Sequence, residues 1–365
     1  MRMKEDYKGI DKGLIAVTLV IFLFGLLVLY SATQAKGMPL TKSYLFRQVT
    51  WAVIGMVFLA GVIAISYQKF IDMAYLVYGA NVFLLMLVLV IGGERMGAQR
   101  WFTIGAFTFQ PSEFIKLSLI LALSAYVGSQ RESMKTIRSL LTASLILGIP
   151  FILVLLQPDL GTALLLLPIF FIILLAGGAD IRHLAVMIGC GTAALPFMWH
   201  FLHGYQKQRL MVFMDPDIDP LGAGYTIIQS KIAIGSGGLL GKGWLSGTQN
   251  QLNFLPERHT DFIFSVIGEE WGFLGAVILV ALYFLIANRA FNIAALANDV
   301  YGKLVASGIA VMLSLQIIIN IGMTIGIMPV VGIPLPLVSY GGSSMITTFI
   351  AIGLLLNVEL RRSRF

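Results

Sequence analysis

Long apolar segments alternate with short polar ones along most of this chain. A helix that spans a bilayer needs about 20 mainly apolar residues, and the alternation predicts ten such helices. They cover residues 12–33, 46–66, 72–92, 111–129, 139–157, 160–178, 183–203, 262–287, 304–328 and 342–358. Between the fifth and sixth lies QPDLGT, where Pro158 and Gly161 favour a tight turn. The pattern therefore predicts an all-α, polytopic integral membrane protein.

The composition agrees with this fold class. Hydrophobic residues make up 58% of the 365 residues and charged residues 12%, whereas soluble domains carry about 25% charged residues. Cys190 is the single cysteine, so an intrachain disulfide is excluded. The sequence has no internal repeat, low-complexity segment or linker, and we expect a single membrane domain over residues 1–365.

The basic residues predict the orientation of the helices. Fourteen Lys and Arg residues lie on the side of the N-terminus, against five in the short loops on the opposite side. Short cytoplasmic loops are enriched in Lys and Arg, so both termini should be cytoplasmic. The large loop between the seventh and eighth helices, about residues 204–261, should be extracytoplasmic. This distribution also accounts for the formal charge of +7, and we expect no nucleic-acid partner.

With this orientation, the segments rich in polar and turn residues all lie on the outer side. They are GGERMGAQRWF (92–102), QPDLGT (157–162), the end of the large loop, and PLPLVSYGGSS (334–344). The predicted cytoplasmic loops are short and plain. We therefore expect the functional site on the outer face, where a cytoplasmic nucleotide is a poor candidate for the substrate.

The large loop ends in FLPERHTDFIF (254–264), a polar cluster whose last member is Asp261. In one interpretation, Thr260 or Asp261 caps the eighth helix by accepting hydrogen bonds from its first N–H groups, which contributes about 1 kcal/mol. In the other, Asp261 is a carboxylate at the mouth of a membrane cavity, where partial desolvation raises its pKa and lets it act as a general base. The two interpretations are compatible.

Two pairs of charged residues fall inside predicted helices. Glu113 and Lys116 are three residues apart and share one helix face, and Glu269 and Glu270 lie about two turns into the eighth helix. Charges within a span are costly unless they are paired or face water, which makes them functional candidates. A structural ion pair and a buried protonated acid are the alternatives, and both stay open at this point.

Residues 235–243, GSGGLLGKG, are close to a phosphate-binding loop, but position 236 is Ser and position 243 is Gly, so the pattern fails. Backbone N–H groups that bind a diphosphate or glycan with Lys242, or a flexible glycine turn, are the two remaining interpretations. Just before it, Tyr225, Ile228 and Ile232 share one face, which predicts a helix lying on the bilayer.

Together these motifs resemble the SEDS family (shape, elongation, division and sporulation), polytopic membrane glycosyltransferases of the bacterial cell wall. The resemblance rests on GAQRWF, FQPSEFIKL, QPDLGT, GYTIIQSKIAIGSGGLLGKGW, GTQNQLNFLPERHTDFIFSVIGEEWGFLGA and PLPLVSYGGSS, which run from the second outer loop almost to the C-terminus. Within the family, GTQNQLNF followed by LPERHTDFIF is most similar to the RodA branch, which serves cell elongation.

The resemblance implies a peptidoglycan glycosyltransferase that polymerises lipid II and releases undecaprenyl diphosphate. The donor is α-linked and the product β-1,4-linked, so the transfer inverts the sugar and needs a base and positive charge at the leaving diphosphate. On the family pattern Asp261 would be the base, with Lys116 and Glu113 as further catalytic residues. The residues expected to bind substrate are Arg95, Arg100, Asp159, Lys242, Arg258, His259, Glu269, Ser339 and Ser343.

The family also implies a class B penicillin-binding protein, a PBP2-type transpeptidase, as partner, together with elongation machinery linked to MreB. It implies the bacterial cytoplasmic membrane, with the active site on the extracytoplasmic side. A divalent cation, Mg²⁺ or Mn²⁺, is a candidate cofactor whose site the sequence does not identify, and no organic cofactor is expected. Two rival functions stay open: a flippase or transporter for lipid II, and a non-catalytic scaffold for the transpeptidase.

Overall fold

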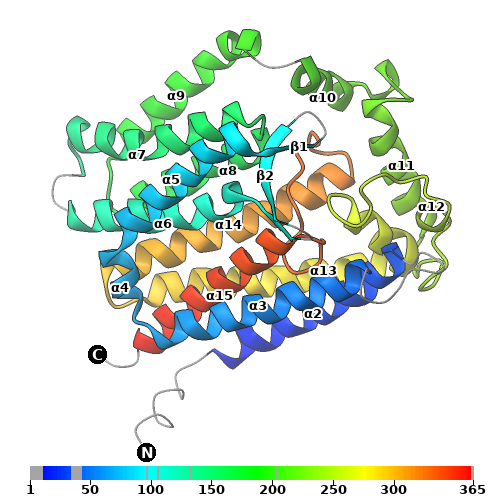
Figure 1. The fold of residues 1–365 in the computed structure, drawn as a ribbon, viewed down its shortest axis with the longest axis horizontal. Coiled ribbons are helices and arrows are strands. Elements are labelled where there is room, and N and C mark those ends of the chain that lie inside the picture. The colour runs from blue at the N-terminus through cyan, green and yellow to red at the C-terminus, as the bar shows by residue number, and fades with distance from the viewer. Residues whose placement is uncertain are drawn as a thin grey trace, which may run out of the picture.

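The computed structural model describes residues 11–33, 43–95, 98–104, 107–130, 134–201 and 204–362, most of them in helices (Figure 1). Ten long helices carry the apolar segments: α2 (Lys12–Thr33), α3 (Tyr44–Ala64), α5 (Ala74–Ile91), α6 (Pro111–Ser129), α7 (Ile137–Leu156), α8 (Leu160–Ala176), α9 (Ile181–Met198), α13 (Ile263–Leu296), α14 (Val300–Thr324) and α15 (Gly342–Arg362). The shorter elements are α4 (Tyr67–Asp72), η2 (Trp199–Phe201), α10 (Gly204–Met214), η3 (Pro216–Ile218), α11 (Ala223–Ser236), α12 (Thr248–Gln251) and strands β1 (Gly93–Arg95), β2 (Ala98–Ile104) and β3 (Phe107–Phe109).

Each predicted apolar segment contains a helix, and most bounds agree within four residues. The eighth helix, α13, runs nine residues past its predicted end at 287, and the predicted end of the seventh, 202–203, lies outside the described residues. Eight of these helices are long and apolar enough to cross a membrane, judged by length and composition. The apolar helices α8 and Ile181–Ala194 in α9 are shorter. A multi-pass membrane protein is thus confirmed, while the exact number of ten spans stays a prediction.

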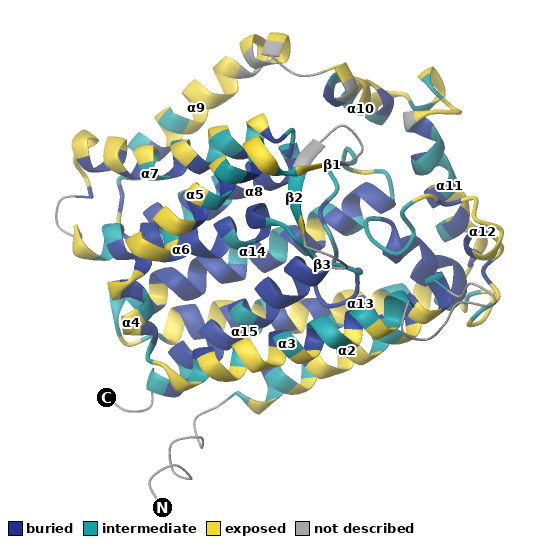
Figure 2. Cartoon of the chain, viewed as in Figure 1, coloured by how far each residue is buried: buried dark blue, intermediate teal, exposed yellow. Residues whose placement is uncertain are grey.

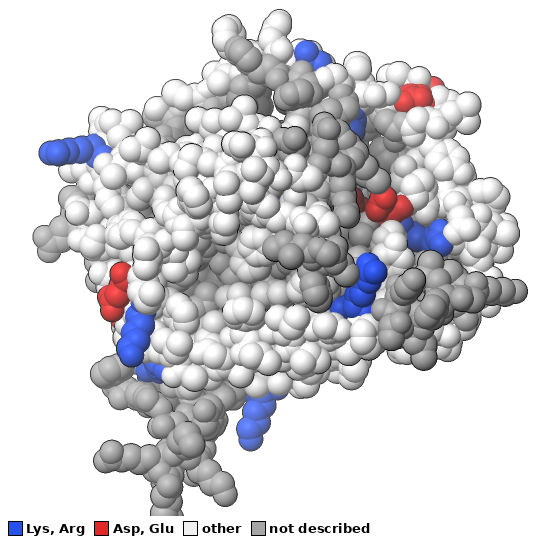
Figure 3. Space-filling view, in the orientation of Figure 1, with Lys and Arg blue, Asp and Glu red and all other residues white. Residues whose placement is uncertain are grey.

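The long helices pack side by side, with α14 and α15 inside the bundle (Figures 1 and 2). In its most apolar stretch, α15 is 89% buried and α6 is 78% buried, whereas α3 and α5 are each 28% buried. The exposed side chains of the outer helices are largely apolar, and the face drawn in Figure 3 carries few charges. Such an apolar outer surface suits contact with lipid.

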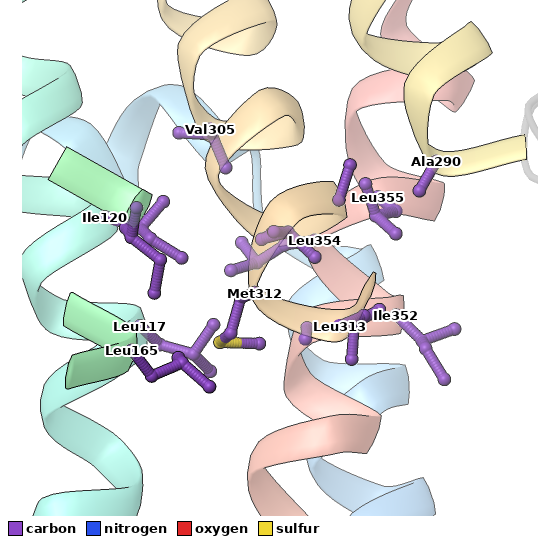
Figure 4. Close-up of a cluster of buried hydrophobic side chains, with 14 of the residues drawn as sticks. Leu117, Ile120, Leu165, Ala290, Val305, Met312, Leu313, Ile352, Leu354 and Leu355 are labelled. Carbon is purple, nitrogen blue, oxygen red and sulfur yellow. The ribbon is translucent and has the colours of Figure 1, made fainter. Parts of the chain in front are cut away.

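The interior is filled by aliphatic side chains from helices far apart in the sequence. Leu117 of α6, Leu165 of α8, Met312 of α14 and Leu354 of α15 converge in one cluster (Figure 4). Their exposed fractions range from 1 to 5%. This packing joins α6, α8, α14 and α15 in the interior of the bundle.

The segment between α5 and α6 corrects the all-α prediction. These residues, which include the motif GGERMGAQRWF, make a three-stranded antiparallel sheet in the order β1-β2-β3. Gly93 pairs with Trp101 across β1 and β2, and Phe102 pairs with Phe109 across β2 and β3. The sheet follows the end of α5 and leads directly into the start of α6.

The long segment 204–261 is also more ordered than a loop, since it contains α10, α11 and α12. These helices lie at the end of the bundle away from the start of α2 (Figure 1). At the opposite end, Asp11 and Arg362 line one pocket. The first turn of α2 and the last turn of α15 are therefore at the same end, as an even number of spans requires.

Candidate functional site

Asp261 lies in a turn and does not cap a helix. Helix α13 begins at Ile263 with Phe262 as its N-cap residue, and in the described chain no side chain caps its first turn. The Phe262 N–H instead donates to the carbonyl oxygen of Glu257 (3.2 Å). The predicted cap by Thr260 or Asp261 is wrong, because the chain makes this additional turn before the helix starts.

The surroundings of Asp261 change its acidity. Its side chain is partly buried, and burial raises its pKa to about 6, since the charged form loses water. The negative charge of Glu257 raises the pKa further, while Arg209 and Arg100 act in the opposite direction. A carboxyl group with this pKa is ionised at neutral pH and is a stronger base than an ordinary aspartate.

Arg100 and Arg209 bring positive charge to this place from distant segments. In β2, Arg100 donates from Nε to the carbonyl of Gln157 (2.9 Å) and lies 3.8 Å from Asp159 Oδ1. In α10, Arg209 donates from Nη1 to the carbonyl of Val330 (3.3 Å). Both arginines line one small pocket. Two guanidinium groups beside a basic carboxylate can stabilise a leaving phosphate group.

Asp159 connects the outer ends of α6 and α8. It is the N-cap residue of α8, accepting from Thr162 N–H (3.2 Å), and it also accepts from Ser112 Oγ at the start of α6 (3.1 Å). The neighbouring Gln110 N–H donates to Ser343 Oγ at the start of α15 (2.9 Å). Three segments that the sequence assigned to one side thus meet in a single hydrogen-bonded network.

Glu113 and Lys116 form the ion pair that their spacing predicts. Lys116 Nζ lies 2.8 Å from Glu113 Oε2, and the two side chains are 2% and 6% exposed. The pair follows Ser112 in the first turns of α6, directly inside the network around Asp159. Buried paired charges at this depth are compatible with a role in structure or in catalysis.

Glu269 is fully buried and anchors the long loop. It accepts hydrogen bonds from Lys242 Nζ (2.8 Å), Thr248 Oγ1 (3.1 Å) and the Gln249 N–H (3.0 Å). Its neighbour Glu270 accepts from Ser31 Oγ of α2 (2.5 Å). In this structure, Glu269 and Lys242, two expected substrate-binding residues, bind each other and hold residues 242–249 against α13.

The glycine-rich segment pairs with a break in α13. At Gly272 the helix is interrupted (φ 64°, ψ −162°), and the N–H groups of Lys242 and Gly243 donate to the carbonyls of Glu269 and Glu270, each at 3.0 Å. A Cβ on Gly272 would lie 2.3 Å from Gly241 N. These two N–H groups are therefore engaged, which removes them as donors to a diphosphate, and the segment is not a free turn.

Arg258 and His259 support the loop that carries Asp261. Arg258 donates from Nε to the carbonyl of Ala32 in α2 (2.7 Å). The His259 ring packs on the Tyr44 ring, with centroids 4.6 Å apart, and burial lowers the pKa of His259. Both residues join this loop to the first two long helices.

Ser339 and Arg95 are the two remaining residues that were expected to bind substrate. Ser339 Oγ donates to the carbonyl of Thr260 (2.6 Å) and accepts from the Leu335 N–H (2.8 Å), so its hydroxyl joins two loops. Arg95 ends β1, and its side chain lies outside the described part of the chain. The structure therefore brings Asp261, Arg100 and Asp159 into one electrostatic neighbourhood.

Three residues at this site were missed in the sequence. Asn320 is a fully buried amide in the apolar helix α14, and an isolated polar residue in a span was an available signal. Glu257 lies four residues before Asp261, but nothing in the pattern distinguished it from its polar neighbours. Arg209 sits in the long loop, and its approach to Asp261 depends on how that loop folds.

The described residues offer little for a preformed metal site. Among them, no group of three or more His, Cys, Asp or Glu side chains could hold a metal ion. Mg²⁺ is often held by one or two carboxylates together with substrate phosphates. Glu257, whose charge acts on Asp261, could supply a carboxylate of that kind, so the site fits a cation that arrives with a phosphate-bearing substrate.

Comparisons with known proteins identify the family of this chain. The family model FtsW/RodA/SpoVE, described as "Cell cycle protein", matches residues 11–364. The chain is 41% identical to the peptidoglycan glycosyltransferase MrdB of Escherichia coli K12 over 359 residues, covering 98% of this chain and 95% of that protein.

Two solved structures are similar over nearly the whole chain. One belongs to a study of the structural coordination of polymerization and crosslinking by a peptidoglycan synthase complex, with a TM-score of 0.83, 38% identity and coverage of 98% and 99% of the two chains. The other is the rod shape determining protein RodA of Thermus thermophilus, with a TM-score of 0.73, 33% identity and coverage of 98% of each chain.

Proposed function

Because this chain belongs to the FtsW/RodA/SpoVE family, we propose that it is a peptidoglycan glycosyltransferase that polymerises glycan chains for cell elongation. Its relative MrdB carries the name of that activity. Asp261 is the residue on which the proposal rests, because its pKa is raised to about 6 in a site where the charges of Arg100 and Arg209 also act on it. A base next to positive charge is what glycosyl transfer from a diphosphate requires.

We propose lipid II as the substrate. The 4-hydroxyl of the acceptor sugar attacks the anomeric carbon of the donor, and its proton passes to the Asp261 carboxylate. The bond between that carbon and the diphosphate oxygen breaks, the electron pair leaves with undecaprenyl diphosphate, and the sugar configuration inverts to β-1,4. Arg100 and Arg209 would stabilise the charge that develops on the diphosphate.

We propose that the Glu113–Lys116 pair contributes a second positive group. Lys116 is almost fully buried and points its ammonium group at Glu113. Glu113 would orient Lys116, and the lysine would contact a lipid II oxygen when the substrate enters. The pair lies beside Ser112, which bonds Asp159, and Asp159 in turn lies near Arg100.

A divalent cation, Mg²⁺ or Mn²⁺, is compatible with this site. Glu257 would hold it together with phosphate oxygens of the substrate. When bound, it would neutralise negative charge on the leaving group. No organic cofactor is part of the proposal.

We further propose that the whole chain forms one membrane domain with ten spans in the bacterial cytoplasmic membrane. Both termini would be cytoplasmic, and β1–β3 and α10–α12 would face outward with the active site. The common position of Asp11 and Arg362 supports this arrangement, because the two ends of the bundle must then lie in one compartment.

We propose a class B penicillin-binding protein of the PBP2 type as the partner. The solved structure with a TM-score of 0.83 comes from a peptidoglycan synthase complex that coordinates polymerization and crosslinking. An MreB-linked elongation machinery would recruit the pair, as the family resemblance implies.

The proposed function is tested by incubating the purified protein with lipid II in detergent. Wild type should form glycan chains, and Asp261→Asn should lose at least about 100-fold in rate, because general-base catalysis is removed. The matched control is Asp217→Asn, the same change at an exposed acid of the long segment, which should polymerise normally.

The same assay separates the rival functions. A lipid II flippase or a scaffold for the transpeptidase yields no glycan chains from any variant. If Asp261→Asn is folded and polymerises as fast as wild type, Asp261 is not the base. In that case the glycosyltransferase assignment would survive and the mechanism would not.

A further inference from the structure

The main chain around Asp261 is held by three hydrogen-bond donors that lie about 60 to 80 residues later in the sequence. Three successive carbonyl oxygens each accept one hydrogen bond: His259 from Tyr340 N–H (2.9 Å), Thr260 from Ser339 Oγ (2.6 Å) and Asp261 from Asn320 Nδ2 (3.0 Å). We call these three bonds the carbonyl clamp. Since no side chain caps α13 in the described chain, the clamp is what joins this turn to α14 and the segment before α15.

Asn320 has the central position in the clamp. Its Nδ2 also donates to the carbonyl of Ile333 (2.8 Å), and because both partners are carbonyl oxygens, only the NH₂ group of the amide suits this place. Next to Ile333, Gly332 is in the left-handed region (φ 72°), and a Cβ there would lie 3.4 Å from Asp261 Oδ2. The Asn320 amide therefore joins the main chain of Asp261 to the segment at Gly332 and Ile333, which lies next to the Asp261 carboxylate.

The buried amide of Asn320 lowers the stability of the fold. Asn320 is 0% exposed, and its Oδ1 has no hydrogen-bond partner in the described part of the chain. A buried polar atom without a partner destabilises the folded state. An apolar side chain of similar size would suit this interior better, so the two donor hydrogens are the feature that distinguishes asparagine here.

We propose that Asn320 is a positioning residue for the general base: through the carbonyl clamp it holds the Asp261 carboxylate where it meets the acceptor hydroxyl. The inference rests on the proposed function, in which Asp261 receives the proton. Asn320 acts on the main chain of Asp261 and needs no contact with substrate. Because displacement of a reacting group by about 1 Å can cost about 100-fold in rate, loss of the clamp should lower kcat.

The test compares Asn320→Leu with a matched control, Asn357→Leu. Asn357 of α15 is also 0% exposed, and its Nδ2 also donates to two carbonyl oxygens, those of Val62 and Ile65. It lies near the end of α3, at the opposite end of the bundle from Asp261. Both variants lose a buried amide that bridges two carbonyls, but only one of them touches the loop of the base.

Two measurements separate positioning from stability. In lipid II polymerisation, Asn320→Leu should lower kcat by about 10- to 100-fold with KM nearly unchanged. The acid limb of its pH–rate profile, which is the fall in rate at low pH, should also move to lower pH, because a released carboxylate gains water. The charged groups around it, Glu257, Asp159, Arg100 and Arg209, stay in place. Asn357→Leu should lower the melting temperature and leave the kcat of the folded protein and the acid limb unchanged.

A second variant covers the case in which Asn320→Leu does not fold. Ser339→Ala removes one hydroxyl and with it the bond to the Thr260 carbonyl, and it should shift kcat and the acid limb in the same direction by a smaller factor. Unchanged kcat and acid limb in the clamp variants, with Asp261→Asn inactive, would overturn the positioning role and leave the proposed function standing. An active Asp261→Asn would overturn both.

Discussion

At the scale of single residues, Asp261 differs from Glu113 and Glu269 in its partners. Glu113 faces the ammonium group of Lys116, and Glu269 faces that of Lys242, each at 2.8 Å. Asp261 has a second acid, Glu257, among its neighbours, and burial adds to the effect of that charge. Asp261 is therefore basic enough to receive a proton near neutral pH.

This difference predicts a pH dependence. Because the pKa of Asp261 is raised to about 6, activity should be highest above that pH and should fall about tenfold per unit below it as the base is protonated. Glu257 raises the pKa, so Glu257→Gln should move the acid limb to lower pH. Arg209 lowers it, so Arg209→Gln should move the limb to higher pH.

Initial rates of lipid II polymerisation between about pH 5 and about pH 8 would measure both shifts. The two variants serve as controls for each other, since they remove opposite charges near the same carboxylate. Shifts in the same direction, or no shift in either variant, would contradict the electrostatic account of Asp261.

At the scale of secondary-structure elements, the break in α13 explains the glycine-rich segment. A helix that stops its hydrogen bonding at Gly272 leaves backbone groups without partners in the interior. The N–H groups of Lys242 and Gly243 satisfy two of these carbonyls, and the Phe273 N–H donates to the carbonyl of Gly238 (2.9 Å). The segment thus supplies the bonds that the helix gives up.

Gly272→Ala should therefore destabilise the protein by about 3 kcal/mol or more. The backbone conformation at Gly272 strains any residue with a Cβ, and that atom would overlap Gly241 N. Gly79→Ala in α5 is the matched control, because a Cβ there meets no atom within 4 Å and alanine favours a helix by about 0.5–1 kcal/mol. Melting curves in detergent should show a lower midpoint for Gly272→Ala and no decrease for Gly79→Ala.

The elements also show how far the sequence could predict the structure. The apolar helices were predictable because each is set by its own composition over about 20 residues. The sheet β1–β3 was not, since strands of three to seven residues give too short a pattern. Asp261 was found from its motif, but its environment was not, because Arg209 and Asn320 reach it through contacts between segments far apart in the chain.

At the scale of the whole molecule, the fold predicts which segments share a compartment. In a background where Cys190 is replaced by serine, a single cysteine at Asp217, exposed in the long segment, should react with an impermeant maleimide added to intact cells. A cysteine at Lys135, exposed between α6 and α7, should react only after the membrane is opened. Labelling of Lys135→Cys from outside would contradict the proposed orientation.

The carbonyl clamp has a consequence for how the protein is made. Asp261 precedes α13, while its three donors lie in α14 and in the segment leading into α15, the most enclosed helix of the bundle. During synthesis from the N-terminus, Asp261 is therefore made before any of the three donors of the clamp. A chain that ends before α14 would lack all three donors, so the turn that carries Asp261 can take its final position only after the segment leading into α15 has been made.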